Sequence, residues 1–131
     1  MKITTKGRYG LKAVVDLASE NKYMSIKTLS ERQGISENYL EQIIAILKKA
    51  GFVGSARGAQ GGYALLKPPG AITVGDVLRS LEGSLLAVDC PDVCGEADCG
   101  DCNTKPVWEK IASSLNDVVD SITVEDLVKN G

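Results

Sequence analysis

Residues 25–51, SIKTLSERQGISENYLEQIIAILKKAG, contain two helical patterns separated by a short turn. Ser25 is placed to cap the first helix, and Gly34 supplies the left-handed residue that ends it. Ser36 then caps a second helix, in which apolar residues recur at offsets of 0, 3, 4 and 7: Leu40, Ile43, Ile44 and Leu47. Two helices joined by so short a glycine-containing turn predict a helix-turn-helix.

The flanking sequence completes a winged helix-turn-helix over residues 1–67. Upstream, the same spacing predicts a helix with Leu11, Val14, Val15 and Ala18 on its inner face. Downstream, residues 52–56 and 63–66 are predicted as short strands around the glycine-rich stretch RGAQGG, which indicates a hairpin with a flexible tip. We therefore expect a mostly α-helical fold with a small β-hairpin wing.

Residues 68–131 predict a second part, with a cysteine segment and helices that pair two copies of the chain. Thr73 can cap a helix that runs to about Glu82, and a long helix starts near Asn103 or Thr104. Thr123 can cap a short last helix. The long helix carries an apolar stripe that we predict as the dimer interface, since a chain of 131 residues offers only a modest core: Trp108, Ile111, Leu115 and Val118.

Charge is divided between the two parts. Residues 1–67 hold 11 Lys and Arg against 5 Asp and Glu, a net charge of +6, whereas residues 68–131 hold 4 against 12, a net charge of −8. A basic first half beside a helix-turn-helix indicates a nucleic-acid partner, although the whole chain has a net charge of −2.

The expected partner is double-stranded DNA with paired half-sites, bound by a homodimer. Gln42 is suited to an adenine edge, Glu41 to accepting from cytosine or repelling a wrong base, and Arg57 to a minor groove. The predicted DNA-binding residues are Lys6, Arg8, Ser36, Asn38, Tyr39, Glu41, Gln42, Lys48, Lys49, Ser55, Arg57 and Gly58.

Four cysteines, Cys90, Cys94, Cys99 and Cys102, lie in a loop too polar to form a core. The sequence lacks an apolar leader and an apolar run long enough to cross a membrane, so we expect a cytoplasmic protein in which these thiols are metal ligands or redox groups rather than structural disulfides. A regulatory disulfide pair is the less favoured alternative to a metal group. Four thiolates select an iron-sulfur cluster or zinc. Their irregular spacing favours a cluster over zinc, because structural zinc usually takes two CxxC-like pairs. No nucleophile–base pair and no histidine are present, so an enzyme is not expected.

The sequence resembles the Rrf-two family of winged-helix regulators nearly from end to end, and its iron-sulfur members most. The matching stretches are Thr5-Lys6-Gly7-Arg8-Tyr9, Ile35-Ser36, Tyr39-Leu40-Glu41-Gln42, Arg57-Gly58, Gly61-Gly62-Tyr63 and the cysteine loop followed by Trp108. The resemblance implies a homodimer with crossed C-terminal helices and a [2Fe-2S] cluster in each subunit. It also implies control of cluster-assembly genes by cluster occupancy, with repression as the expected role and with Glu41 discriminating between operator classes.

The resemblance also implies which residues hold the cluster. Cys90 and Cys102 match the first and last family cysteines, and Cys94 is favoured over Cys99 as the middle one. Lys105 stands where such members place a histidine, and a lysine cannot ligate at neutral pH. The fourth ligand is therefore open between Cys99 and an acid. The alternative functions are a nitric-oxide or redox sensor of the same family and a zinc-stabilised interaction module.

Overall fold

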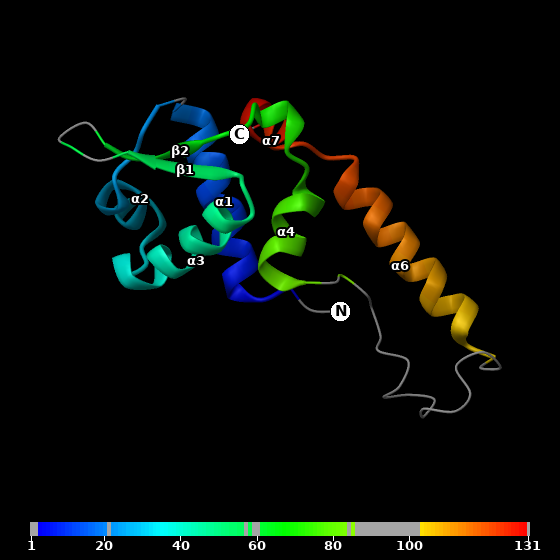
Figure 1. The fold of residues 1–131 in the computed structure, drawn as a ribbon. Coiled ribbons are helices and arrows are strands. Elements are labelled where there is room, and N and C mark those ends of the chain that lie inside the picture. Colours follow the sequence, from blue (N-terminus) through cyan, green and yellow to red (C-terminus); the bar gives the residue numbers. More distant parts are fainter. Residues whose placement is uncertain are drawn as a thin grey trace.

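The computed structural model describes residues 3–20, 22–56, 58, 61–83, 85 and 103–130, which form a helical body with one β-hairpin and one projecting helix (Figure 1). The elements are α1 (Thr5–Glu20), α2 (Ile26–Gln33), α3 (Glu37–Lys49), β1 (Val53–Ala56), β2 (Gly62–Leu65), α4 (Val74–Glu82), α6 (Lys105–Asp120) and α7 (Val124–Asn130). The expected mostly α-helical winged fold is confirmed. None of the described helices is both long enough and apolar enough to cross a membrane.

The turn between α2 and α3 has the expected chemistry. The Ser25 side chain accepts a hydrogen bond from the Thr28 N–H, which satisfies a free amide at the start of α2. Gly34 ends α2 with φ +67°, a conformation that a side chain at this position would strain. The Ser36 hydroxyl accepts from the Tyr39 N–H at 3.1 Å and so begins α3. These local bonds fix the direction in which α3 leaves the turn.

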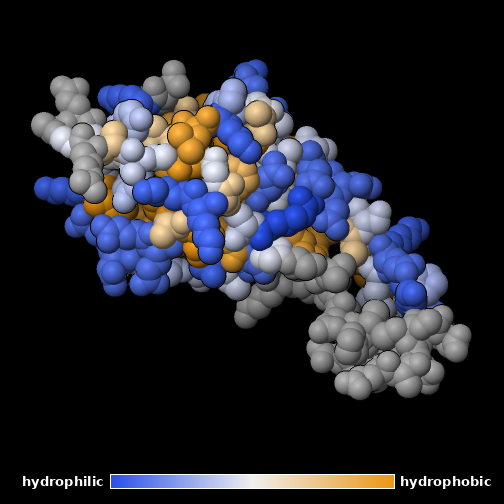
Figure 2. Space-filling view, viewed as in Figure 1, coloured by the Kyte–Doolittle hydropathy of each residue, from blue (hydrophilic) through white to orange (hydrophobic). Residues whose placement is uncertain are grey.

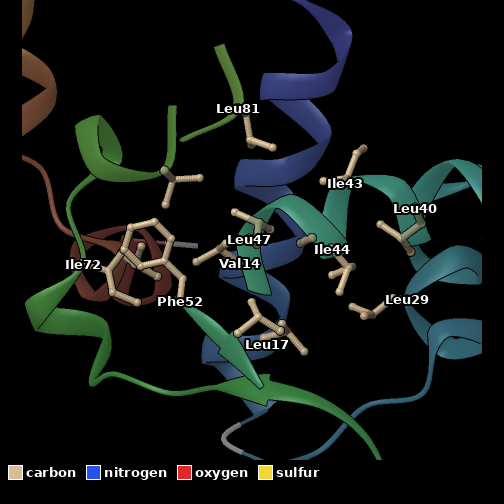
Figure 3. Packing of buried hydrophobic residues seen from close by; sticks show 14 of the residues in the cluster. Val14, Leu17, Leu29, Leu40, Ile43, Ile44, Leu47, Phe52, Ile72 and Leu81 are labelled. Atoms are coloured by element: carbon tan, nitrogen blue, oxygen red, sulfur yellow. The ribbon is translucent and has the colours of Figure 1, made fainter. Parts of the chain in front are cut away.

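The core forms where α3 crosses α1 and receives residues from the other elements (Figure 3). The four apolar residues of α3 that the sequence singles out, Leu40, Ile43, Ile44 and Leu47, are each at most 1% exposed. Burying side chains of this size stabilises the fold by about 1.5–3 kcal/mol each. The core extends past residue 67, because Ile72, Val77, Leu81 and Val124 belong to the same cluster.

The inner face of α1 differs from the expected one. Val14 is fully buried, but the other three residues of the predicted stripe, Leu11, Val15 and Ala18, are only partly buried. The fully buried residues of α1 instead include Gly7, Gly10, Ala13 and Leu17. The buried face of α1 is therefore turned toward α4 relative to the predicted face. The end of α4 packs closely against the two glycines, and a methyl group at Gly10 would collide with Leu81. Leu11 and Val15 are left beside Leu127 of α7, around a shallow hollow of about 270 Å³.

The wing is an antiparallel pair in which Val53 faces Leu65 and Ala56 faces Gly62. Met24 extends it, since Met24 and Tyr63 exchange two backbone hydrogen bonds of 2.8 Å. Both strands begin one residue away from their expected starts. Phe52 is buried just before β1, and its carbonyl accepts from the Leu66 N–H at the base of the hairpin.

Helix α6 contacts the body near its C-terminal end and projects away from it (Figure 1). The Arg79 guanidinium of α4 donates to both carboxylate oxygens of Asp120, at 2.8 and 2.9 Å, and to Asn116 Oδ1 at 2.6 Å. Caps at Thr73 and Thr123, each completed by an acid three residues later, start α4 and α7 as expected. The first half of α6 therefore extends beyond its attachment to α4.

Candidate nucleic-acid interface

The outer face of α3 presents polar side chains in its first two turns. Ser36, Asn38, Glu41 and Gln42 are exposed, and Tyr39 is half-buried. Because α3 is held from behind by its fully buried face, these groups lie on a rigid edge that is free to enter a groove. The chemistry is that of base reading: an amide, a carboxylate and a hydroxyl near the start of a helix.

The end of α3 is basic and is tied to the wing. Lys48 and Lys49 are both exposed. The Lys48 ammonium donates to the Ser55 hydroxyl at 3.0 Å, so the structure brings together two residues that the sequence predicts separately. The contact links the last turn of α3 to β1, and it places a cation between the helix and the hairpin.

The tip of the wing is only partly described. Gly58 is exposed with φ +106°, and its carbonyl accepts from the Gly61 N–H at 3.0 Å. Glycine is favoured at that φ because it has no Cβ. Arg57, which the sequence predicts as a minor-groove residue, lies outside the described residues.

The start of α1 lies against the start of α3. Lys6 is half-buried and Arg8 is exposed. The rings of Tyr9 and Tyr39 meet edge to face, with centroids 6.3 Å apart and an interplanar angle of 84°. The Lys12 ammonium lies 5.8 Å from the centre of the Tyr9 ring.

Sequence reasoning omitted three residues of this surface of α1. Thr5, Tyr9 and Lys12 join Arg8 around a hollow of about 320 Å³. Their spacing of 0, 3, 4 and 7 is the signal that could have revealed them, since it places all four on one face of a helix. From this segment, only Lys6 and Arg8 are predicted as DNA-binding residues, because of their charge.

Two ion pairs hold the scaffold around the interface. Arg32 of α2 donates to Glu20 of α1, and this bond lowers the pKa of the Glu20 carboxyl. Likewise, the hydrogen bonds from Arg79 lower the pKa of Asp120 and attach α6 to α4. Both pairs are partly exposed, so they orient helices more than they stabilise them.

The four cysteines, Cys90, Cys94, Cys99 and Cys102, lie outside the described residues. In the part of the chain that is described, no group of three or more His, Cys, Asp or Glu side chains lies together as a metal site would require. Lys105, the position at which the resemblance leads us to expect a ligand, is the first residue of α6, and its ammonium lies 3.8 Å from Glu109 Oε1.

The residue that ends α4, just before the cysteine segment, bonds to the start of α1. Glu82 Oε1 accepts from the Gly7 N–H at 3.0 Å, from the Thr4 N–H at 3.2 Å and from the Thr4 hydroxyl. A carboxylate at this point satisfies free amides at the helix N-terminus and interacts favourably with its dipole. Glu82 therefore connects the end of α4, the last described helix before the cysteines, to the helix that carries Arg8 and Tyr9.

The predicted dimer stripe is partly open to solvent. Ile111 and Val118 are 41% and 57% exposed, and Val107, which the prediction omitted, is 51% exposed. Leu115 and Trp108 are half-buried, and the Trp108 indole donates to the Thr104 hydroxyl at 3.1 Å. The space-filling view also shows hydrophobic surface between α4 and α6 (Figure 2).

Comparison with known proteins identifies relatives along the whole chain. The family model described as Rrf2, iron-dependent transcriptional regulator, matches residues 3–130. The HTH-type transcriptional regulator CymR of Bacillus subtilis is 41% identical over 129 residues, covering 97% of this chain and 89% of the relative. The regulator IscR of Enterobacter sp. is 41% identical over 135 residues, covering 99% and 81%.

Solved structures agree with these sequence relatives. CymR, the global cysteine regulator of B. subtilis, matches with a TM-score of 0.86 at 39% identity, covering all of this chain and 98% of that one. The T. potens IscR structure matches with a TM-score of 0.80 at 48% identity, covering 99% and 88%. The chain is a DNA-binding transcription regulator rather than an enzyme, and it belongs to the Rrf2 family.

Proposed function

We propose that this regulator senses iron-sulfur cluster status through its four cysteines and adjusts the operator affinity of a homodimer accordingly. Residues 1–67 would read DNA, and residues 68–131 would carry the sensing and pairing elements. The observation that carries the proposal is the Glu82 contact, because it joins the end of α4, eight residues before Cys90, to the start of α1. Genes of cluster assembly are the proposed targets, and repression is the proposed action.

The DNA-reading part of the proposal rests on the exposed edge of α3. Gln42 would pair with an adenine edge, and Glu41 would accept from cytosine or reject an unsuitable base. Lys48 and Lys49 would contact phosphates, while Arg57 would enter the minor groove from the wing.

The donor set fits an iron-sulfur cluster. The chain offers four cysteines and no histidine, so a metal group in this segment takes soft thiolate ligands. Cys90, Cys94 and Cys102 would be three of the ligands, and Cys99 would supply the fourth. When bound, a cluster of this type supplies a redox centre whose potential depends on its ligands. Lys105 is paired with Glu109 within α6, which agrees with its having no ligand role.

Sensing would act through the helices that flank the cysteine segment. Before the segment, Glu82 at the end of α4 bonds to the start of α1, and after it, α6 leads to Asp120, which Arg79 holds to α4. Ordering of the segment would bias both contacts and thereby the spacing of the two recognition helices in a dimer. Coupling between two such sites is usually worth about 1–3 kcal/mol, or roughly 5–150-fold in affinity.

The exposed apolar side chains of α6 support pairing of two copies. Val107, Ile111 and Val118 lie on a helix that projects from the body, where a partner helix could cover them. Trp108 and Leu115 would complete the same interface. A dimer would also present two recognition helices to paired half-sites.

Metal analysis of protein purified without oxygen tests the proposal. We expect two irons and two sulfides per chain, with visible absorption from thiolate-to-iron charge transfer. Replacement of Cys99 by Ala should reduce cluster retention if this thiol is the fourth ligand. One zinc per chain, without sulfide, would contradict the cluster and support a structural module.

The similarity to CymR favours a second candidate. That relative is described as a global cysteine regulator, and it matches this chain along its whole length. A regulator of cysteine supply would change operator affinity in response to a sulfur metabolite or thiol oxidation. It would contain neither iron nor sulfide, so the same metal analysis separates the two candidates.

A further inference from the structure

The hollow on α1 is basic and is formed by one face of the helix. Thr5, Arg8, Tyr9 and Lys12 line it, at positions three or four residues apart. In the described part of the chain, no ion pair uses Arg8 or Lys12. Two cations that lack acidic partners at one surface point attract an anion from solution.

The acidic residues farther along the same side of α1 are engaged elsewhere. The Asp16 carboxylate accepts from the Gln33 amide of α2 at 3.2 Å, and Glu20 is paired with Arg32. Among the described residues, neither acid forms an ion pair with Lys12. The positive charge is confined to the first half of α1, next to the start of α3.

The hollow is held in a fixed position relative to the base-reading edge. The Tyr9 ring packs edge to face on Tyr39, and the Tyr39 N–H is bonded to Ser36 in the first turn of α3. The Lys12 ammonium lies over the Tyr9 ring, 5.8 Å from its centre. The exposed Lys12 ammonium therefore lies on the same side of the molecule as the start of α3.

We propose that this hollow binds a backbone phosphodiester of operator DNA, next to the major groove that α3 enters. Arg8 and Lys12 supply the charge, and the exposed Thr5 hydroxyl supplies a hydrogen-bond donor. Tyr9 is a positioning residue, which holds Lys12 in register with Tyr39. The inference rests on the DNA-binding function of the family and is independent of the cluster.

The test measures how the affinity for DNA depends on salt. Wild type, Lys12→Gln and the control Lys22→Gln are titrated by fluorescence anisotropy with an operator duplex selected by the wild-type protein, and with a scrambled duplex, from 50 to 200 mM KCl. Lys22 lies beyond the far end of α1, so the control removes the same charge elsewhere. Circular dichroism first verifies that all variants are folded.

We expect Lys12→Gln to lower the slope of log K against log [salt] by about 0.9 for each subunit bound. That change makes the affinity loss over the salt range about 3.5-fold smaller per contact. The ratio of operator to scrambled affinity should stay unchanged, because a phosphate contact carries no sequence information. Tyr9→Phe should behave as wild type, since the ring is retained, while Tyr9→Ala should reduce the slope as Lys12→Gln does.

An unchanged slope in Lys12→Gln, or an equal change in Lys22→Gln, would overturn the phosphate site. A change in the specificity ratio would also overturn it, because it would indicate a base contact instead. These outcomes leave the proposed function intact as long as the wild-type protein binds its operator and responds to the cluster.

Discussion

The contact between Glu82 and the start of α1 predicts that two substitutions, Gly7→Ala and Glu82→Ala, are strongly coupled. The Gly7 N–H donates to Glu82 Oε1, and a methyl group on Gly7 would overlap that same oxygen and lie 3.1 Å from Cδ and Cγ. The two residues therefore depend on each other: glycine makes room for the carboxylate, and the carboxylate caps the helix.

The magnitudes follow from the cap and from helix propensity. Glu82→Ala removes a capping carboxylate and should lower the free energy of unfolding by about 1–2 kcal/mol. Gly7→Ala displaces the same carboxylate but gains about 1 kcal/mol of helix propensity, so its net cost should be about 0–1 kcal/mol. In the double variant the overlap is absent while the propensity gain remains. Its stability should therefore equal that of Gly7→Ala, with a coupling energy of about 1–2 kcal/mol.

Wild type, the two single variants and the double variant form a double-mutant cycle. The free energy of unfolding of all four is measured by urea unfolding of the metal-free protein, followed by circular dichroism at one fixed protein concentration. The control is Glu31→Ala, which removes an exposed acid from α2 and should change stability by less than about 0.5 kcal/mol. Costs that add to within about 0.5 kcal/mol would refute the reasoning, because residues that do not touch behave in that way.

Three further predictions concern pairing, acid stability and the start of α3. Val118→Asp should convert dimers to monomers, because it places a charge on the exposed apolar face of α6. Ser113→Asp, on another face of the helix, should leave the dimer intact. Size-exclusion chromatography with light scattering measures the mass, and a dimeric Val118→Asp protein would exclude this face as the interface. Because Arg79 lowers the pKa of Asp120 from its ordinary value of 3.8, the stabilisation is complete above about pH 4 and is lost as the pH falls through the lowered pKa. The melting temperature should therefore fall less steeply below pH 4 in Asp120→Asn than in wild type, and parallel profiles would contradict this assignment. Ser36→Ala should cost about 1 kcal/mol of unfolding free energy and weaken operator binding, and Ser36→Asp, which also caps, should restore the stability.

Local chemistry explains which parts of the fold could be predicted from the sequence. Caps and turns depend on residues a few positions apart, so Ser25, Gly34, Ser36 and Thr73 indicated the helix boundaries correctly. The inner face of α3 was equally clear, since four large apolar side chains repeat at a helical period. Binding roles proposed for the exposed residues remain predictions, because exposure alone does not identify what a side chain contacts.

The inner face of α1 could not be predicted because it depends on tertiary contact. Gly7 and Gly10 have no side chain, so a search for periodic hydrophobic residues does not identify them as buried. They are buried because side chains of α4 pack where a Cβ would lie. The hollow beside Arg8 was missed for a similar reason. Lys12 acquires a defined position only through Tyr9, and Tyr9 only through Tyr39 on another helix.

The most direct test of the central proposal compares the operator affinity of one protein preparation before and after its cluster is removed. Protein reconstituted without oxygen, and the same protein after the cluster is removed by chelation, are titrated with the selected operator at one salt concentration. A sensor that acts through the Glu82 and Arg79 contacts should show a difference of roughly 5–150-fold, and Glu82→Ala should reduce that difference. Equal affinity of the two forms for every operator tested would contradict cluster sensing.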